Sequence, residues 1–388
     1  MIEKNSAFFV LDYSVTGGVE RVISSLSSLF IKYGLKFNHL ISLFSCNQNP
    51  EITFPPNLKI NVLFNETRGD VSKELCRLLK EKKITTLIFQ GDNMTTALQV
   101  LKGAKDAGCR AILHYHGSPY GYIKKYIYKD DIIENPAAVF KLLWAGVQYP
   151  FKKIKLKKAI LLSDDFVCVS NGAREEVNNI FNFPPRISNK IITIHNPLSF
   201  KVNDRAVDLS LKENIIVYVS RLHRKHKNSM MVLKGWQKIA NENPGWRLQI
   251  IGDGKLKKKM LQYVVDNEIP AVLFTGMVSN VDEYLKKSSI SVLTSDCEGL
   301  GMGLLESAVY KNAIVATKSD GGVVDIVEDG ITGYLVPRNN NKLFAEKLQQ
   351  LITQQNTREQ MAASLYNKMN CFSDEKIMAQ WLQLLSKK

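Results

Sequence analysis

Short apolar runs alternate with longer stretches of helical periodicity from one end of the chain to the other. The runs predicted to be strands in the first half are 7–11, 38–44, 84–89, 109–114 and 165–169. Those in the second half are 214–219, 247–251, 271–275, 289–294 and 313–317. Strands and helices that alternate in this way form parallel sheets covered by helices. The pattern therefore predicts an α/β protein with two Rossmann-like, doubly wound domains.

A polar stretch that starts near Pro197 separates the two strand-rich halves. Proline and polar residues between two such halves are typical of an interdomain hinge. The last residues have helical periodicity, with Ser373 placed to cap a helix that we expect to pack back on the N-terminal domain. The predicted bounds of the N-terminal domain, the linker, the C-terminal domain and the final helix are 1–196, 197–212, 213–370 and 371–388.

The composition is that of a globular protein with a strong positive charge. The chain has 388 residues, of which 45% are hydrophobic, so it is long enough for two domains with separate cores. Its 52 lysines and arginines exceed its 37 aspartates and glutamates, which gives a net charge of +15. This excess favours a polyanionic partner: a nucleic acid, an anionic membrane face or a phosphorylated ligand.

The six cysteines are scattered and include no CxxC pair. This spacing is typical neither of a zinc site nor of a secreted disulfide scaffold, so we expect reduced thiols in the cytoplasm. The sequence has no run of about 18 apolar residues, and its first apolar segment is too short for a signal peptide. Any membrane contact is therefore expected to be peripheral.

A paired-glycine turn joins the first predicted strand to a helix. Gly17 and Gly18 precede a helical pattern that runs from Val19 to Tyr33. A strand, a glycine turn and a helix N-terminus present backbone N–H groups to an anion, and glycines let a phosphate come close. An ordinary tight turn is the alternative, and the GxGxxG pattern of dinucleotide-binding proteins is absent.

A basic loop follows the strand predicted at 214–219. Ligands of open α/β sheets bind at the carboxyl ends of the strands, which places Arg221 and Lys227 at the mouth of a cleft. An arginine fork and a lysine suit a diphosphate whose negative charge grows as it leaves. Lys225 is a rival for the role of Lys227, and a solvated basic loop is the alternative.

The segment from Glu298 to Glu306, EGLGMGLLE, gives the clearest indication of a binding site. It lies between a predicted strand and a helix. Its alternate glycines let the backbone wrap around a bound group and expose N–H donors at the helix N-terminus. Two other strand ends carry weaker indications: Gly252 lies in a glycine-rich turn, and the turn at Met277 and Val278 would offer backbone groups to a nucleobase.

Eight segments, taken in the order in which they occur in the chain, resemble the family-four retaining glycosyltransferases of the GT-B fold over roughly residues 7–370. The matching sequences are GGVERV, HYHGSP, VSNGAREEV, HNPL, SRLHRKHKN, IGDG, the stretch from TGMVSN to LLESA, and GGVVDIVEDGITGYLV. The resemblance implies an acceptor-binding and a nucleotide-sugar-binding domain that face each other across a cleft. Ser220, Leu300, Gly303 and Asp325 depart from the family pattern, which bears on the identity of the donor sugar more than on the reaction class.

The resemblance also implies roles for single residues. Arg221 and Lys227 would neutralise the diphosphate, and His116 would lie near the transferred sugar. Glu298 would contact the sugar hydroxyls, and Glu306 would hold the ribose. The catalytic set would be Glu298, His116, Arg221 and Lys227. The donor site would comprise Gly17, Gly18, Arg221, Lys227, Gly252, Met277, Val278, Glu298, Gly299, Leu300, Gly301, Met302, Gly303, Leu304 and Glu306.

No metal and no cofactor beyond the nucleotide sugar is expected, because the family has no essential metal and the sequence shows no cluster of metal ligands. His114 and His116 are the one pair that suggests a metal site. We expect their side chains to point to opposite faces of a strand end, which would separate them. Since no carboxylate stands out as a nucleophile, front-face attack is favoured, with the leaving diphosphate accepting the proton of the acceptor.

Residues 120–158 combine aromatic side chains with many lysines. Aromatic rings and lysines together suit an anionic membrane surface, whereas a solvated helix face beside a core helix is the alternative. With the resemblance, this composition favours a peripheral enzyme at the inner face of the cytoplasmic membrane. It would move a hexose, expected from UDP, to a lipid-linked glycan of lipopolysaccharide core, O-antigen or capsule.

Two other functions remain open at this point. A different GT-B enzyme, such as a nucleotide-sugar epimerase or a soluble glycoside synthase, would use the same donor site. A basic nucleic-acid-binding protein would account for the net charge. However, the sequence has no nucleic-acid-binding motif, and glycine loops at strand ends would have no purpose in such a protein, so we expect no nucleic-acid partner.

Overall fold

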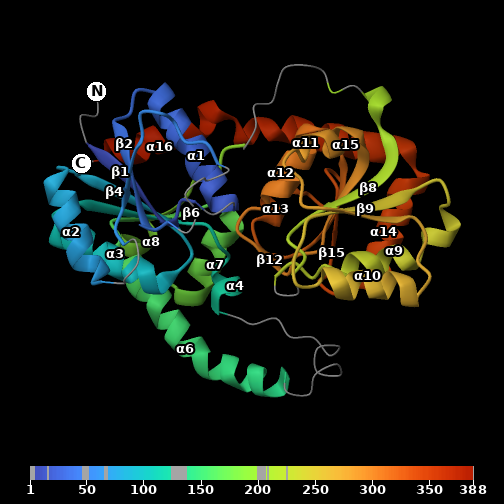
Figure 1. Ribbon diagram of the computed structural model, residues 1–388, viewed down its shortest axis with the longest axis horizontal. Coiled ribbons are helices and arrows are strands. Elements are labelled where there is room, and N and C mark those ends of the chain that lie inside the picture. The colour runs from blue at the N-terminus through green and yellow to red at the C-terminus, as the bar shows by residue number, and fades with distance from the viewer. Residues whose placement is uncertain are drawn as a thin grey trace. The chain divides into compact units, whose positions relative to one another are not determined.

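The computed structural model describes residues 5–14, 17–45, 52–64, 69–123, 138–198, 207, 209–223 and 226–387. The chain forms two compact units, the first made of residues up to 199 and from 372 onward, the second of residues 200–371. Each unit contains a parallel sheet with helices on both of its faces, as Figure 1 shows. The prediction of two Rossmann-like α/β domains is confirmed.

In the described part of the first unit, seven strands pair in the order β3-β2-β1-β4-β5-β6-β7, with parallel neighbours throughout. The strands are β1 (Ser6–Asp12), β2 (Phe37–Phe44), β3 (Lys59–Val62), β4 (Thr86–Gly91), β5 (Arg110–Tyr115), β6 (Asp165–Cys168) and β7 (Ile191–Thr193). The helices are α1 (Gly18–Lys32), α2 (Val71–Glu81), α3 (Met94–Asp106), α4 (Pro119–Ile123), α6 (Ala138–Leu162), α7 (Asn171–Phe181), α8 (Pro185–Ser188) and α16 (Asp374–Ser386).

In the described part of the second unit, six strands pair in the order β10-β9-β8-β11-β13-β15, again in parallel. They are β8 (Glu213–Val219), β9 (Arg247–Ile251), β10 (Val272–Gly276), β11 (Ser288–Leu293), β13 (Ala313–Thr317) and β15 (Tyr334–Val336). The helices are α9 (Met230–Gln237), α10 (Lys257–Asp266), α11 (Asp282–Lys287), α12 (Met302–Val309), α13 (Val323–Ile326), α14 (Asn341–Thr353) and α15 (Gln355–Lys368). A separate two-stranded ladder pairs β12 (Cys297–Glu298) with β14 (Asp320–Gly321).

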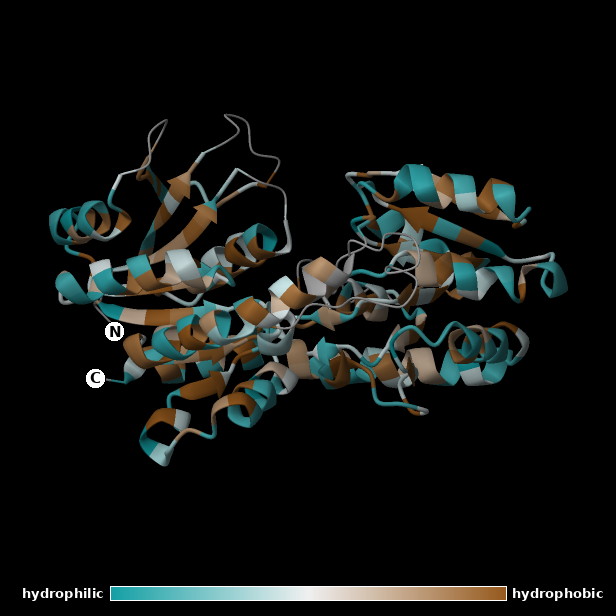
Figure 2. Cartoon of the chain, turned by 90° about the horizontal axis from the view of Figure 1, so that it is seen from below, coloured by the Kyte–Doolittle hydropathy of each residue, from teal (hydrophilic) through white to brown (hydrophobic). Residues whose placement is uncertain are grey.

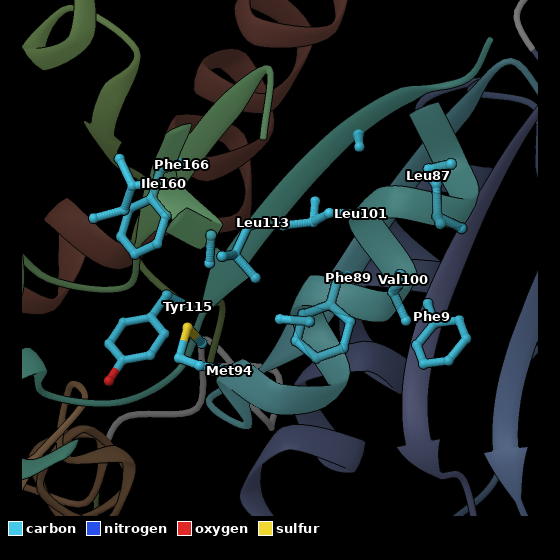
Figure 3. Packing of buried hydrophobic residues seen from close by; sticks show 14 of the residues in the cluster. Phe9, Leu87, Phe89, Met94, Val100, Leu101, Leu113, Tyr115, Ile160 and Phe166 are labelled. Atoms are coloured by element: carbon cyan, nitrogen blue, oxygen red, sulfur yellow. The ribbon is translucent and has the colours of Figure 1, made fainter. Parts of the chain in front are cut away.

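The packing of α3 on the first sheet shows how the hydrophobic pattern becomes a core. Leu87 and Phe89 lie two positions apart on β4 and therefore point to one face of the sheet. Met94, Val100 and Leu101 of α3 cover that face, and all five side chains are buried (Figure 3). Across the molecule, the strands are mostly hydrophobic and the helices also carry hydrophilic residues (Figure 2). This division fixes which face of each helix meets a sheet.

The C-terminal helix α16 is part of the first unit. The Ser373 hydroxyl accepts a hydrogen bond from the Lys376 amide, which confirms the predicted N-cap. The buried ring of Trp381 has its centroid 5.5 Å from that of Phe30 on α1 and 5.1 Å from that of His114 on β5. The last residues of the chain therefore complete the core of the first domain.

Helix α6 is buried along only one of its halves. Leu156 and Ile160, near its C-terminal end, lie in the core of the first unit. In contrast, Phe140 is 74% exposed and Trp144 is 59% exposed, in the half that extends away from the body of the unit (Figure 1). Several large exposed apolar side chains on one helix are characteristic of an interaction surface.

Candidate active site

The second unit brings Lys227 and Glu298 together at the carboxyl edge of its sheet. The Lys227 Nζ atom donates to Glu298 Oε1 at 2.6 Å, and the two side chains are 28% and 13% exposed. Burial opposes protonation of Lys227, but the Glu298 carboxylate outweighs this effect and raises the pKa of Lys227. The positive charge of the exposed Arg221 lowers the pKa of the same ammonium, so both predicted cations belong to one electrostatic site.

The backbone around Lys227 is held in an unusual conformation. His226 and Asn228, on either side of it, both have left-handed φ values, of 68° and 44°. The Lys227 carbonyl accepts hydrogen bonds from the hydroxyls of Tyr218, at 3.2 Å, and Thr294, at 3.1 Å. Non-glycine residues adopt this region at a cost and mostly where the surroundings fix them, which is common at binding sites. The loop therefore presents the ammonium group from a preorganised position.

Glu298 is positioned by the ladder between β12 and β14. Its partner across the ladder is Gly321, and its carbonyl accepts the amide of Gly322 at 3.1 Å. Arg338 supports the ladder by pairing with Asp320 at 2.9 Å. Backbone pairing thus fixes the main chain of Glu298, and the contact with Lys227 holds its carboxylate.

The glycine segment after Glu298 leads directly into α12. Gly301 is the N-cap of this helix and has a φ of 96°, a conformation that favours glycine. A Cβ atom at Gly303 would meet nothing within 4 Å, so this backbone is open. The side chains of Leu300 and Leu304 are buried, which leaves only their backbone for a ligand. The first turn of α12 therefore offers N–H groups beside the Lys227–Glu298 pair.

The remaining predicted donor residues of this unit differ in how deeply they are buried. Glu306 is buried on α12, and Gly299 and Met302 are partly buried beside it. Met277 is 82% exposed after β10, whereas Val278 packs against a small apolar cluster. All of them follow strands that end at the same edge of the second sheet.

Gly252 has a structural reason to be glycine. Its φ is 131°, and a Cβ atom there would lie 1.9 Å from the carbonyl oxygen of Ser220. The Ser220 amide also donates to the Ile251 carbonyl at 3.0 Å. The loop that carries Arg221 therefore lies directly on the backbone of Gly252. This glycine permits the close approach of two protein backbones, whether or not it also contacts a ligand.

In the first unit, the paired glycines begin α1. Gly17 is the N-cap in an extended conformation, and Gly18 is the first helical residue, with open space where a Cβ atom would be. Helix α1 has 15 residues, so its N-terminus carries a substantial dipole. Lys225, the rival for the role of Lys227, lies outside the described part of the chain. The same is true of residues 124–137 in the aromatic and lysine-rich segment 120–158, and of residues 199–206 and 208 in the predicted linker.

His116 lies in a small polar cluster at the end of β5. Its Nε2 atom is 2.6 Å from Gln90 Oε1, and His114 Nδ1 is 2.8 Å from the same oxygen. The centroids of the two histidine rings are 4.3 Å apart. The expectation that these rings would point to opposite faces is therefore wrong, because side chains two positions apart share a face of a strand. Burial lowers the pKa of His116 to about 3 and that of His114 well below its usual range, so both rings are neutral.

Several residues that hold the site were not singled out in the sequence. Gln90 is the clearest of them, since it is polar but 1% exposed near the end of an apolar strand. A glutamine within an apolar run indicates a buried polar contact, so the sequence alone could have pointed to Gln90. Tyr218 and Thr294 look like ordinary strand residues, and only the fold reveals that they bind the Lys227 carbonyl.

Among the described residues, no group of three or more histidine, cysteine, aspartate or glutamate side chains is arranged to hold a metal ion. Likewise, none of the helices described is long and apolar enough to cross a membrane.

Comparisons with known proteins agree with this architecture. Residues 200–368 match the family described as glycosyl transferases group 1. The chain is 24% identical to the Campylobacter jejuni enzyme named GalNAc-alpha-(1->4)-GalNAc-alpha-(1->3)-diNAcBac-PP-undecaprenol alpha-1,4-N-acetyl-D-galactosaminyltransferase, and the match covers 97% of both chains.

Two solved structures resemble the whole chain. One is an S. aureus TarM mutant in complex with fondaparinux, alpha-GlcNAc-glycerol and UDP, with 13% identity, coverage of 99% of this chain and 100% of that one, and a TM-score of 0.76. The other is the apo form of the lipopolysaccharide outer core galactosyltransferase WaaB, with 19% identity, coverage of 97% and 98%, and a TM-score of 0.72. These likenesses identify the fold as GT-B, as the sequence predicted.

Proposed function

We propose that this chain, whose residues 200–368 form a domain of the glycosyl transferases group 1 family, transfers a hexose-type sugar from a nucleotide sugar to a bacterial surface glycan. The observation that carries the proposal is the Lys227–Glu298 pair, 2.6 Å apart at the carboxyl edge of the second sheet. A cation and a carboxylate that are fixed beside a helix N-terminus suit a ligand with a diphosphate and sugar hydroxyls.

In the proposed reaction, the bond between the anomeric carbon and the diphosphate oxygen breaks. The acceptor hydroxyl forms the new bond on the same face of the sugar, and its proton passes to the leaving diphosphate oxygen. Arg221, Lys227 and the first turn of α12 stabilise the negative charge that develops on the diphosphate. Glu298 accepts hydrogen bonds from sugar hydroxyls, and His116 contributes a further polar contact to the substrate. The chemistry needs no metal, because protein cations and N–H groups neutralise the charge.

The comparisons support the substrate class by analogy. The Campylobacter relative is named for an alpha linkage to an undecaprenol-linked glycan, and the TarM structure contains UDP. An alpha-linked product from an alpha-linked nucleotide sugar requires retention of configuration. We therefore assign UDP as the preferred nucleotide, a retaining mechanism, and a lipid-linked or lipopolysaccharide-type glycan as acceptor.

A binding screen followed by a transfer assay tests this function. We expect one UDP-sugar to raise the melting temperature of the purified protein more than UDP alone, since a ligand that binds only the folded state stabilises it. Radiolabel from that UDP-sugar should then move to a lipid-linked glycan acceptor. Label that stays on the nucleotide in an epimerised sugar would indicate an epimerase instead. A protein that is stabilised by no nucleotide sugar would contradict the proposal.

We further propose that α6 docks on an anionic membrane surface. Five of its exposed apolar side chains follow a four-three-four-three spacing and so form one stripe along the helix. The stripe consists of Phe140, Trp144, Val147, Phe151 and Ile154. The exposed lysines 157 and 158 lie beyond the stripe, whereas Lys152 and Lys155 form hydrogen bonds within the first unit. The expected location is the inner face of the cytoplasmic membrane, where the lipid-linked acceptor would be available.

Liposome flotation should show this docking. We expect the protein to float with vesicles that contain phosphatidylglycerol and to float less with pure phosphatidylcholine, since each lysine near anionic lipid contributes about 1 kcal/mol. Replacing Trp144 and Phe151 by serine should reduce recovery. Val265→Ser is the matched control, because Val265 is 70% exposed but lies on α10 of the second unit. Equal recovery with both kinds of vesicle would count against docking.

A further inference from the structure

The amide group of Gln90 is buried between two neutral histidine rings. One of its terminal atoms lies 2.8 Å from His114 Nδ1 and 2.6 Å from His116 Nε2. The other terminal atom has no hydrogen-bond partner. If the first atom is the oxygen, the NH₂ group is left buried with two unpaired donors. An unpaired buried donor is costly, which makes this orientation of the amide unfavourable.

A half-turn of the amide exchanges the two atoms and removes this problem. The NH₂ group then donates one hydrogen bond to each ring, and an unpaired carbonyl oxygen is left in place of the unpaired donors. Unpaired carbonyl oxygens are the more common of the two in buried positions. With Gln90 as the donor, both contacted ring nitrogens must be acceptors, and each neutral ring carries its proton on its other nitrogen.

The protonation of His114 follows the orientation of the amide. Its Nε2 atom is buried and has no hydrogen-bond partner among the described residues. With the Gln90 oxygen at Nδ1, this Nε2 atom is an unpaired acceptor, and the amide leaves two further donors unpaired. With the turned amide, Nε2 carries the proton, and its single N–H group replaces the two unpaired donors of Gln90. The turned amide therefore leaves fewer buried donors without a partner.

We propose that Gln90 is a positioning residue that fixes His116 in the tautomer with its proton on Nδ1. In this tautomer, Nε2 accepts from Gln90 and the Nδ1–H group is the donor that His116 presents to an oxygen atom of the substrate. Among the described residues, no hydrogen bond of Nδ1 is observed, so the group is available for this role. The tautomer follows from the protein alone, whereas its use in sugar transfer rests on the function proposed above.

Nitrogen NMR of the ¹⁵N-histidine-labelled protein tests the tautomer without any substrate. Two-bond ¹H–¹⁵N correlations distinguish a protonated ring nitrogen from one with a lone pair, and His116→Asn identifies the signals of His116 by their loss. We expect protonated Nδ1 and unprotonated Nε2 for His116, and the reverse for His114. A His116 ring that is protonated on Nε2 would overturn the proposal, even if the protein proved to be an active transferase.

The variant Gln90→Glu tests the consequence. A carboxylate only accepts hydrogen bonds, so both rings must donate to it, and the proton of His116 is expected to move to Nε2. The lost donor should lower kcat by about 10- to 100-fold while the affinity for free UDP stays unchanged. Gln249→Glu is the matched control, since Gln249 is a 7% exposed strand glutamine of the second unit whose amide donates to Thr275.

The possible results separate the two proposals. An unchanged His116 tautomer in Gln90→Glu would refute the positioning role, and so would a moved proton with unchanged kcat. Transfer activity that is absent from the unaltered protein, together with the expected tautomer, would refute the proposed function alone.

Discussion

Replacing Lys227 by alanine is expected to lower kcat at saturating nucleotide sugar by about 10²- to 10³-fold, the usual cost of removing one charge-stabilising group. The reason is that the Lys227 ammonium is the better fixed of the two cations in the site. It is held by Glu298 at 2.6 Å and by a loop with two left-handed residues. A cation that is already in place stabilises the negative charge that develops on the leaving diphosphate most strongly, because it does not have to move during the reaction.

Steady-state kinetics over a range of donor concentrations measure this effect. Lys286→Ala is the matched control: Lys286 forms an ion pair with Glu283 at 2.8 Å, but both side chains are largely exposed. We expect this control to keep its kcat, since exposed pairs of this kind contribute little. If Lys227→Ala melts like the unaltered protein and turns over within threefold of it, Lys227 does not stabilise the leaving group.

The sheets could be predicted from the sequence because their strands are continuous apolar runs. The run at 214–219 became β8, from Glu213 to Val219, and the run at 247–251 became β9 with the same bounds. Among the described strands, those that escaped prediction are β3, β7, β12, β14 and β15, which have only two to four residues each. A run of that length is too short to show alternation, and it becomes a strand because a neighbouring strand offers it hydrogen bonds.

The site was less predictable, because its contacts join distant parts of the chain. The sequence could place Lys227 and Glu298 at strand ends of one sheet. Their direct contact spans 71 positions and depends on the ladder that holds β12. The pair of His114 and His116 shows a different limit. Side chains alternate along a strand, so the sequence was enough to predict that the two rings share a face. Their common contact with Gln90 could not be predicted, because it depends on which strand lies beside β5.

Gly252 illustrates how a motif residue can serve the site through the backbone alone. In the sequence, the glycine suggested close approach of a ligand. In the structure, the group that comes closest is the carbonyl of Ser220, directly before Arg221. The two explanations predict different results for one substitution, because a residue needed only for a ligand tolerates alanine in the free protein.

We therefore expect Gly252→Ala to destabilise the second unit by about 3–6 kcal/mol, from the strained φ of 131° and the overlap with backbone atoms together. Thermal unfolding without ligand measures this loss. Gly245→Ala is the matched control: its Cβ atom would have its nearest contact 4.0 Å away, at Asn214, and its φ is not positive. We expect that variant to unfold within about 1 kcal/mol of the unaltered protein. If Gly252→Ala behaves like Gly245→Ala in the free protein but loses donor binding, the glycine is needed for the ligand and not for the Arg221 loop.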